Sequence, residues 1–248
     1  MALPSPLSFR YISIRKLAIT NMSSNIKILL VDDHAIVREG YRSLLQKQAN
    51  MEVVAEASDG QQAYLKYREF EPDIVIMDIS MPGQSGLEAI SRIRQFNSEA
   101  KILVFSMHEN PSFAIQATRA GAFGYVTKSS DPEVLIRAIN DVYQGQHSLS
   151  ADIAQALALE KLGTDSTALE DLTVREFEIF RMLVEAHPSQ EIAETLNISP
   201  KTVANTHYII KKKLGVDSDI ELTRLAIKLN LLNLLDLVEA NDNSPQPD

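Results

Sequence analysis

Short apolar runs alternate with amphipathic segments along residues 26–143. Runs rich in β-branched and other apolar side chains predict strands at 26–31, 51–57, 74–77, 101–106 and 124–127. Segments whose apolar positions recur at helical spacing predict helices at 35–47, 61–70, 87–96, 111–120 and 132–143. A regular alternation of this kind is typical of a doubly wound α/β fold, in which right-handed crossovers join parallel strands.

Polar side chains follow four of these strands, at the point where each strand ends. Asp32 and Asp33 end the first strand, Asp78 the third, Ser106 the fourth and Lys128 the fifth. Because the carboxyl ends of parallel strands meet at one edge of the sheet, where α/β folds bind ligands, we expect all five side chains there. Each of them alone has an ordinary structural explanation, such as a helix cap, a turn or a solvated charge. Their shared edge favours a chemical role.

The residue types at this edge suit the transfer of a phosphoryl group. Carboxylates that lie close together repel one another unless a cation joins them, and hard oxygen ligands suit Mg²⁺. A lysine can pair with added negative charge, and a serine hydroxyl can donate a hydrogen bond to a phosphoryl oxygen. We therefore expect Asp78 to accept a phosphoryl group while Mg²⁺ and Lys128 neutralise the charge. His34 and His108 flank the same edge, and we interpret both as solvated loop side chains.

Composition narrows the class of protein. The 248 residues have room for two domains, and the absence of cysteine excludes disulfides and thiolate metal sites, in agreement with a reducing, cytoplasmic location. No apolar run approaches the roughly 20 residues that span a bilayer, so we expect no membrane partner. The net charge of -9 argues against non-specific coating of nucleic acid, but a local basic surface can still bind DNA.

A second set of helical patterns begins near residue 171. Thr173, with Glu176 three residues later, predicts a capping box, and Ser189 and Ser199 are expected to cap two further helices. A short turn separates those two helices, which is the geometry of a helix-turn-helix that reads DNA. Lysines without any acid give the second of them, at 200–214, a local charge of about +4: Lys201, Lys211, Lys212 and Lys213.

The predicted recognition helix offers several side chains to double-stranded DNA. Phosphate contacts are expected from Lys201, Lys211 and Lys212. Four further residues are expected to face DNA: Thr202, Asn205, Thr206 and Tyr208. Asn205 can pair with adenine, and the methyl group of Ala204 can touch thymine.

Both halves of the chain resemble known families. Asp32-Asp33, Asp78 within Met-Asp-Ile-Ser-Met-Pro-Gly, Ser106 and Gly124-Tyr125-Val126-Thr127-Lys128 resemble the receiver domain of bacterial response regulators. Leu172-Thr173-Val174-Arg175-Glu176, Ser199-Pro200-Lys201-Thr202-Val203 and Lys213-Leu214-Gly215-Val216 resemble the LuxR-type helix-turn-helix. The chain as a whole is similar to the NarL/FixJ group of response regulators.

This resemblance implies a flavodoxin-like receiver with a five-stranded parallel sheet, followed by an all-α DNA-binding domain. It implies that a sensor histidine kinase phosphorylates Asp78. It also implies a Mg²⁺ site formed by Asp33, Asp78 and the backbone carbonyl of Ser80, with Asp32 acting partly through water.

The resemblance carries three further expectations. Tyr125 is similar to the switch aromatic of receivers, which turns inward as Ser106 moves to the phosphoryl group. The phosphorylated protein is expected to form a homodimer, and the leucine-rich last helix at 219–237 fits that role. A cis peptide bond after Lys128 is less expected than in many receivers, because Ser129 stands where they have proline.

These patterns divide the chain into five segments. We expect a disordered leader or a mis-assigned start with Met22 as the true one (1–24), a receiver domain (25–146), a linker (147–170), a helix-turn-helix domain (171–237) and a disordered tail (238–248).

Two other functions are open from the sequence alone. The first is a protein that binds DNA constitutively and takes no phosphoryl group, although the intact set of acids, hydroxyl and lysine argues against it. The second is a phosphatase with an aspartate nucleophile, but such enzymes usually carry a second acid two residues later, where this chain has Ser80. We therefore predict a transcription regulator rather than an enzyme.

Overall fold

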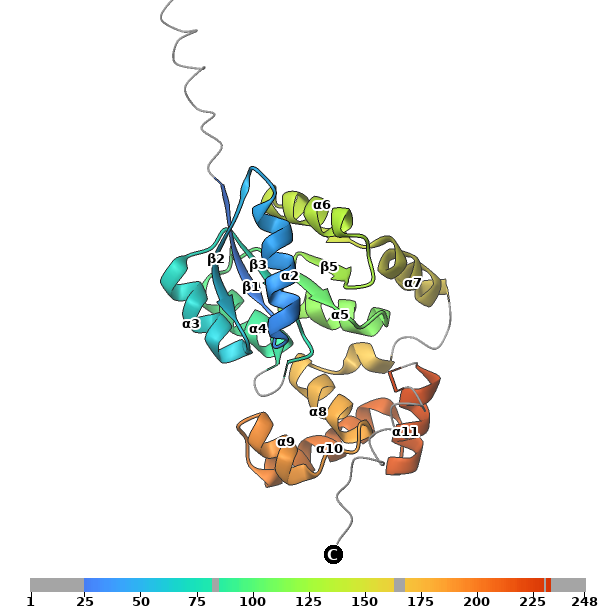
Figure 1. The fold of residues 1–248 in the computed structure, drawn as a ribbon. Coiled ribbons are helices and arrows are strands. Elements are labelled where there is room, and N and C mark those ends of the chain that lie inside the picture. The colour runs from blue at the N-terminus through green and yellow to red at the C-terminus, as the bar shows by residue number, and fades with distance from the viewer. Residues whose placement is uncertain (1–24, 82–84, 163–167, 230, 233–248) are drawn as a thin grey trace, which may run out of the picture.

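The structure is a computed structural model that describes residues 25–81, 85–162, 168–229 and 231–232. It has an α/β part up to residue 162 and a helical part from residue 168, which pack against each other (Figure 1). The predicted leader with its alternative start, the predicted tail and residues 163–167 of the predicted linker lie outside the described residues.

The strands of the α/β part form one parallel sheet. Within the described residues it has six strands in the order β2-β1-β3-β4-β5-β6. Their bounds are Ile26–Val31 (β1), Met51–Ala57 (β2), Ile74–Met77 (β3), Ile102–Ser106 (β4), Gly124–Thr127 (β5) and Ser148–Leu149 (β6). Every residue of β3 is buried, because helices cover both faces of the sheet, and this explains why its sequence is apolar throughout. The five predicted strands are confirmed.

The sixth strand corrects the prediction of a five-stranded sheet. Its two residues are too short to show any periodicity, and they join the sheet only because they pair with Gly124 and Tyr125 of β5. Helix α7 (Ala151–Leu162) follows directly. The hydroxyl of Thr127 donates a hydrogen bond to Asp152 of this helix at 2.8 Å, and Ile153 is fully buried. The segment after residue 146 therefore begins as an extension of the sheet.

Helices cover both faces of the sheet. They are α2 (Ala35–Gln46) and α6 (Pro132–Tyr143) on one face, and α3 (Gly60–Phe70), α4 (Gly86–Phe96) and α5 (Pro111–Ala120) on the other (Figure 1). Leu45 and Ile139 pack against the first face, and Ile90 and Ala117 against the second. The predicted doubly wound fold is confirmed, and the strand order is the one of flavodoxin-like domains with β6 added at one edge.

The helical part is a short bundle. Its elements are the 3₁₀ turn η1 (Ala168–Asp171), α8 (Val174–Val184), α9 (Ser189–Thr195), α10 (Pro200–Leu214) and α11 (Asp219–Lys228). Thr173 and Glu176 form the predicted capping box. Ser199 caps α10 by accepting a hydrogen bond from the backbone N–H of Thr202 at 3.0 Å. None of the helices within the described residues is long and apolar enough to cross a membrane.

Two predicted helix ends are wrong. Ser189 is not a cap but the first residue of α9; the cap position belongs to Pro188, whose backbone is extended and whose side chain makes no cap hydrogen bond. The last helix ends at Lys228 instead of residue 237, although residues 233–237 lie outside the described residues. Leu232 continues the apolar pattern of that helix, but it is buried against the bundle from a bend instead of a helical turn.

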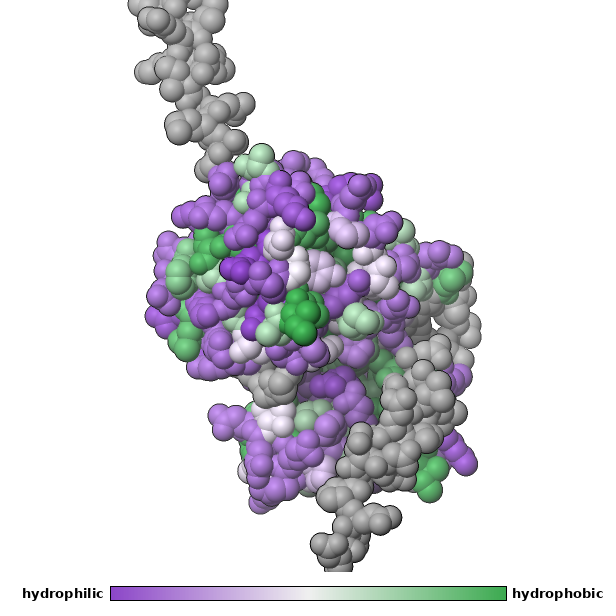
Figure 2. Space-filling model, viewed as in Figure 1, coloured by the Kyte–Doolittle hydropathy of each residue, from purple (hydrophilic) through white to green (hydrophobic). Residues whose placement is uncertain are grey.

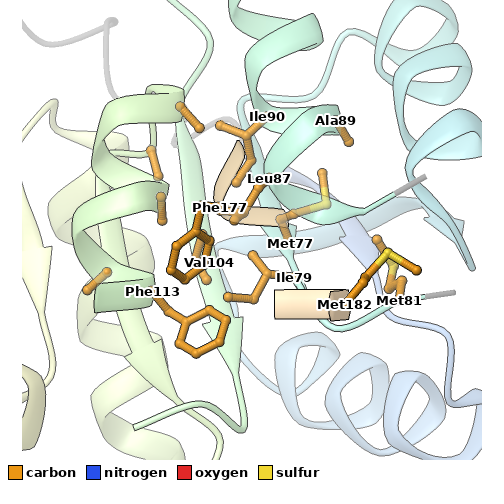
Figure 3. Close-up of a cluster of buried hydrophobic side chains, with 14 of the residues drawn as sticks. Met77, Ile79, Met81, Leu87, Ala89, Ile90, Val104, Phe113, Phe177 and Met182 are labelled. Carbon is orange, nitrogen blue, oxygen red and sulfur yellow. The ribbon is translucent and has the colours of Figure 1, made fainter. Parts of the chain in front are cut away.

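One hydrophobic cluster joins the two parts. Phe177 and Met182 of α8 lie among Ile79, Met81 and Phe113 of the α/β part (Figure 3). Phe177 is fully buried and meets the ring of Phe113 edge-on, with centroids 5.3 Å apart. The face of the molecule drawn in Figure 2 is mostly hydrophilic, in contrast to this interface. Ile79 and Met81 lie in the segment that follows β3, at the carboxyl edge of the sheet. Docking against these residues therefore places α8 beside that edge.

Polar contacts surround this cluster. Arg175 of α8 donates a hydrogen bond to Glu88 of α4 at 2.7 Å, and Gln116 of α5 donates to the carbonyl oxygen of Leu169 at 3.1 Å. Glu178 is buried beside them, and neither of its carboxylate oxygens accepts a hydrogen bond. Arg175 lies 3.7 Å from Glu178, so one guanidinium faces a carboxylate on each side of the interface.

Replacing Glu178 by Gln is expected to remove a pH dependence of stability. Burial, and then the charge of Glu88, raises the pKa of Glu178 from 4.5 to about 7. The folded state therefore holds this proton more tightly than the unfolded state. As a result, the free energy of unfolding falls by on the order of 3 kcal/mol as pH rises from 4.5 to about 7, and it levels off above that pH.

Urea unfolding across about pH 5 to pH 8 measures this effect. The wild-type midpoint should fall as pH rises, whereas Glu178→Gln should give a flatter profile and greater stability at the upper end. Glu194→Gln, on the exposed face of α9, is the matched control and should follow the wild type. An equally steep profile in Glu178→Gln would rule out Glu178 as the source.

Candidate functional site

The candidate site lies at the carboxyl ends of the central strands. The register of β1 and β3 aligns Val31 with Met77, so Asp32 and Asp78 leave the sheet side by side, each 3% exposed. Gly86 begins α4 against the backbone of Asp78, where a Cβ atom would collide with the carbonyl oxygen of Asp78. This close approach fixes where the segment after β3 can run.

Lys128 connects the two aspartates. It follows β5, and its Nζ donates hydrogen bonds to Oδ2 of Asp32 at 2.5 Å and to Oδ2 of Asp78 at 2.6 Å. Burial on its own lowers the pKa of Lys128. The charge of Asp78 and the hydrogen bonds to both carboxylates outweigh burial, so this pKa lies above its usual value. The ammonium group is therefore charged at neutral pH and pairs with both carboxylates in a nearly closed environment.

Asp78 is held at both of its oxygens. Oδ1 accepts a hydrogen bond from the backbone N–H of Ser80 at 3.0 Å, and Oδ2 accepts the one from Lys128. The carboxylate is thus fixed in orientation before any reaction. Ser80 contributes its N–H to this arrangement, while the role predicted for its carbonyl oxygen stays a prediction.

Asp33 and His34 extend the acidic edge towards solvent. Asp32, Asp33 and His34 each offer one possible ligand atom, and these atoms lie within 4.8 Å of one another. His34 Nδ1 is 2.9 Å from Oδ1 of Asp33, yet this buried oxygen accepts no hydrogen bond. The contact is therefore an approach of polar atoms and not a directed hydrogen bond. The side chain of His34 is 67% exposed, as predicted.

Ser106 and Tyr125 lie in the interior of the same edge. Ser106 ends β4, pairs with Thr127 of β5 and is fully buried. Tyr125 points inward, and its hydroxyl donates a hydrogen bond to the carbonyl oxygen of His108 at 2.8 Å. Burial raises the pKa of Tyr125 above its usual value, while a hydrogen bond with Ser106 acts against that rise. The two predicted switch residues are thus brought together.

His108 is not the solvated loop side chain that the sequence predicted. Its ring stacks on Phe113 of α5, with centroids 3.9 Å and planes 3° apart. Burial, and then the charge of Arg181 from α8, lowers the pKa of His108 to about 4, so the imidazole is neutral at pH 7. Phe113 is only five residues away in the sequence, but Arg181 comes from α8, which only the fold brings next to the loop, so no local pattern could reveal this environment.

Hydrogen bonds close the loop after Lys128. The hydroxyl of Ser129 donates to Glu109 at 2.8 Å, and the hydroxyls of Thr127 and Ser130 lie 2.9 Å apart. All peptide bonds between described residues are trans, including the one after Lys128, as the serine at position 129 led us to expect.

Helix α10 presents most of its predicted DNA-contact residues to solvent. Val203, Ile210 and Leu214 face the bundle core, which leaves the opposite side of the helix open. The predicted residues that are exposed there are Lys201, Thr202, Asn205, Tyr208 and Lys212. Thr206 is only partly exposed.

The lysines at the end of α10 have different partners. Nζ of Lys211 donates a hydrogen bond to Asp219 of α11 at 2.9 Å, and Lys213 donates to Glu176 of α8 at 2.7 Å. Lys212 instead lies over the exposed ring of Tyr208, 5.0 Å from its centroid. Of the three, Lys212 is the one whose charge is not already paired with a carboxylate in the described part of the chain.

Comparison with known families agrees with this geometry. The family model described as response regulator receiver domain matches residues 28–140, and the one described as bacterial regulatory proteins, luxR family, matches residues 170–226. The response regulator UvrY of Escherichia coli K12 is 40% identical over 210 residues, which cover 84% of this chain and 96% of UvrY.

Solved structures resemble the chain as well. A LuxR-family two-component response regulator from Aurantimonas sp. is 51% identical with a TM-score of 0.55, over 56% of this chain and 100% of that one. RcsB from Salmonella enterica serovar Typhimurium, solved bound to promoter rprA in the presence of phosphomimetic BeF3-, is 27% identical with a TM-score of 0.66, over 82% and 98%. This chain therefore belongs to the NarL/FixJ-type two-component response regulators, in which a receiver domain precedes a LuxR-type DNA-binding domain.

Proposed function

We propose that a sensor histidine kinase phosphorylates this chain on Asp78, and that phosphorylation controls its binding to double-stranded DNA and thereby transcription. The observation that carries the proposal is the contact of Lys128 with the carboxylates of Asp32 and Asp78 at the carboxyl edge of the sheet. A phosphoryl acceptor needs a carboxylate in a fixed orientation and a cation that neutralises incoming charge. Asp78 has the first through Ser80 and the second through Lys128.

Mg²⁺ is the cofactor that suits the acidic edge. Asp32, Asp33 and Asp78 would hold it with hard oxygen atoms, together with the backbone carbonyl of Ser80. One oxygen of Asp33 is buried and accepts no hydrogen bond, which leaves it available to a cation. When bound, Mg²⁺ neutralises negative charge on the phosphoryl group. Lys128 would then turn from the aspartates to a phosphoryl oxygen.

The switch would use Ser106 and Tyr125. The buried hydroxyl of Ser106 would donate a hydrogen bond to a phosphoryl oxygen, and Tyr125 would keep its inward position behind it. Both residues border the segments that contact α8, so a rearrangement there would loosen the docked helical part. The freed part would pair with that of a second copy, which makes a homodimer the DNA-binding form.

The helical part would act as the DNA-binding domain at 171–237, after a receiver at 25–146 and a linker at 147–170. Its α10 would enter the major groove, with Asn205 and Tyr208 near base edges and Lys201 and Lys212 on phosphates. Thr202, Thr206 and Lys211 would contribute further contacts, the last after it leaves Asp219. Related RcsB has been solved bound to a promoter.

We infer a regulator of the cytoplasm rather than an enzyme. The family consists of DNA-binding transcription regulators, and the chromosome that such a protein reads lies in the cytoplasm of a bacterium. Ser80 stands where a phosphatase with an aspartate nucleophile would carry its second acid. The chemistry at Asp78 would then serve the switch alone.

Asp78→Ala should abolish phosphorylation. Incubation with Mg²⁺ and acetyl phosphate should add about 80 Da to the wild type, as read by intact-protein mass, and nothing to the variant. Asp73→Ala is the matched control, because Asp73 precedes β3 at the opposite edge of the sheet, where it accepts a hydrogen bond from the backbone of Lys27. An adduct that persists in Asp78→Ala would mean that another residue is the acceptor. No adduct in the wild type would favour a constitutive DNA binder.

Lys128→Ala should destabilise the protein in the absence of divalent cations. The change leaves two buried carboxylates without their shared cation, at an expected cost of about 3 kcal/mol. Added Mg²⁺ should restore part of this loss, and urea unfolding with and without Mg²⁺ measures both effects. Lys101→Ala is the control, because this lysine contacts the carbonyl oxygen of Tyr143 away from the acidic edge. Equal midpoints for wild type and Lys128→Ala without Mg²⁺ would contradict the proposed pairing.

Lys212→Ala and Asn205→Ala should weaken DNA binding in different ways. Loss of the Lys212 charge should lower affinity for all sequences and reduce the slope of log affinity against log salt by about 0.9. Loss of the Asn205 amide should leave that slope unchanged and relax selection at one base position by about 1–3 kcal/mol. Binding of a randomised duplex pool at several salt concentrations, followed by sequencing, separates the two. Lys27→Ala, on β1, is the control, and a slope change in that variant would argue against α10 as the DNA-contacting helix.

A further inference from the structure

The loop between β4 and α5 connects the two switch residues to the helical part. His108 is the point of connection on the receiver side. Its backbone N–H donates a hydrogen bond to the hydroxyl of Ser106 at 3.3 Å, and its carbonyl oxygen accepts one from the hydroxyl of Tyr125 at 2.8 Å. Any movement of either switch residue therefore acts on the backbone of His108.

The side chain of His108 points the other way, into an aromatic row that ends in α8. Its ring stacks face to face on Phe113 at 3.9 Å, and Phe113 meets Phe177 edge-on at 5.3 Å. Figure 3 draws Phe113 and Phe177 next to each other, beside Ile79 and Val104. The edge-on pair of Phe113 and Phe177 is an arrangement that stabilises two rings beyond the burial of their area, and the parallel stack of His108 on Phe113 adds the contact of two flat surfaces.

The chemical state of the His108 ring suits this packing. Its pKa is lowered to about 4, chiefly by burial, so the ring is a neutral aromatic at pH 7. The charged groups that act on it are Arg181 of α8, Asp78 and Lys128. Two residues further on, Asn110 donates a hydrogen bond to the carbonyl oxygen of Leu229 at the end of α11. The loop thus contacts the helical part directly through Asn110, and His108 reaches it through Phe113.

We propose that His108 is a positioning residue that couples the position of the Ser106 hydroxyl to the docking of α8, through the row His108, Phe113 and Phe177. The inference rests on the proposed function, because it assumes that Ser106 turns to a phosphoryl oxygen. When it turns, the hydroxyl leaves the N–H of His108, the loop shifts, and the imidazole moves off Phe113. The contact with Phe177 weakens, and α8 undocks.

The coupling must work in both directions. A phosphoryl analogue on Asp78 that loosens docking raises the affinity for DNA, and DNA bound to the helical part raises the affinity for the analogue by the same factor. A ring that only filled space would change the stability of the fold without changing that factor. The factor is therefore the readout that separates a coupling role from a structural one.

Dissociation constants for a fluorescent duplex of random sequence at low ionic strength, with and without beryllofluoride and Mg²⁺, test the proposal. Their ratio is the coupling factor. In His108→Ala we expect tighter DNA binding without beryllofluoride and a coupling factor reduced by about two- to twelvefold, the contribution of one aromatic pair. His108→Phe keeps the stack and should retain the wild-type factor.

His147→Ala is the matched control, because its ring is also stacked on a phenylalanine, Phe123 at 5.2 Å, but outside the interface. It should retain the wild-type factor. Phe113→Leu keeps apolar volume without the ring, so it should reproduce the reduced factor if His108→Ala proves too unstable to measure.

The outcomes separate the inference from the function on which it rests. A wild-type factor in both His108→Ala and Phe113→Leu would overturn the role of the aromatic row. So would a reduced factor in His108→Phe, because the ring would then not act by stacking. If the wild type is phosphorylated on Asp78 but has a factor of one, the coupling fails while the phosphorylation stands. If the wild type takes no phosphoryl group, both fail.

Discussion

The ammonium group of Lys128 between two buried carboxylates is the interaction on which the site depends. Asp32 and Asp78 are each 3% exposed, and without the shared cation their charges would oppose folding of the edge itself. Because the three residues end β1, β3 and β5, the register that builds the sheet also builds this contact. A phosphoryl group or a divalent cation competes for the same oxygens. Its arrival therefore changes the balance of charge at a place where the surrounding segments are closely packed.

Those segments are also the ones that hold the helical part. Ile79 and Met81 follow Asp78, and the loop with His108 follows Ser106, so the two strands that carry the acceptor and the hydroxyl both lead into the interface with α8. Packed interfaces respond to small shifts by changing between arrangements instead of deforming gradually. Local chemistry at the edge of the sheet can therefore alter the position of the LuxR-type domain, in which α10 is the predicted recognition helix.

Much of this could be predicted from the sequence, because it follows from short-range patterns and one topological rule. The strands, the helices around them and the clustering of Asp32, Asp78 and Lys128 need only periodicity and the fact that parallel strands end at one edge. Strand β6 could not be predicted, because a strand of two residues is too short to show an alternation of apolar and polar positions. The partial burial of His108 beside α8 and the pairing of Lys211 with Asp219 could not be predicted either, since Arg181 and Asp219 come from other helices and only packing brings them there.

Amide hydrogen exchange with and without beryllofluoride and Mg²⁺ tests most directly whether charge at Asp78 loosens the docked helical part. We predict faster exchange in α8 and in the loop at 107–110 when the analogue binds, with little change in β1 and β3. Asp78→Ala should show neither increase. Unchanged exchange in α8 of a wild-type protein that carries the analogue would contradict the coupling of phosphorylation to domain release.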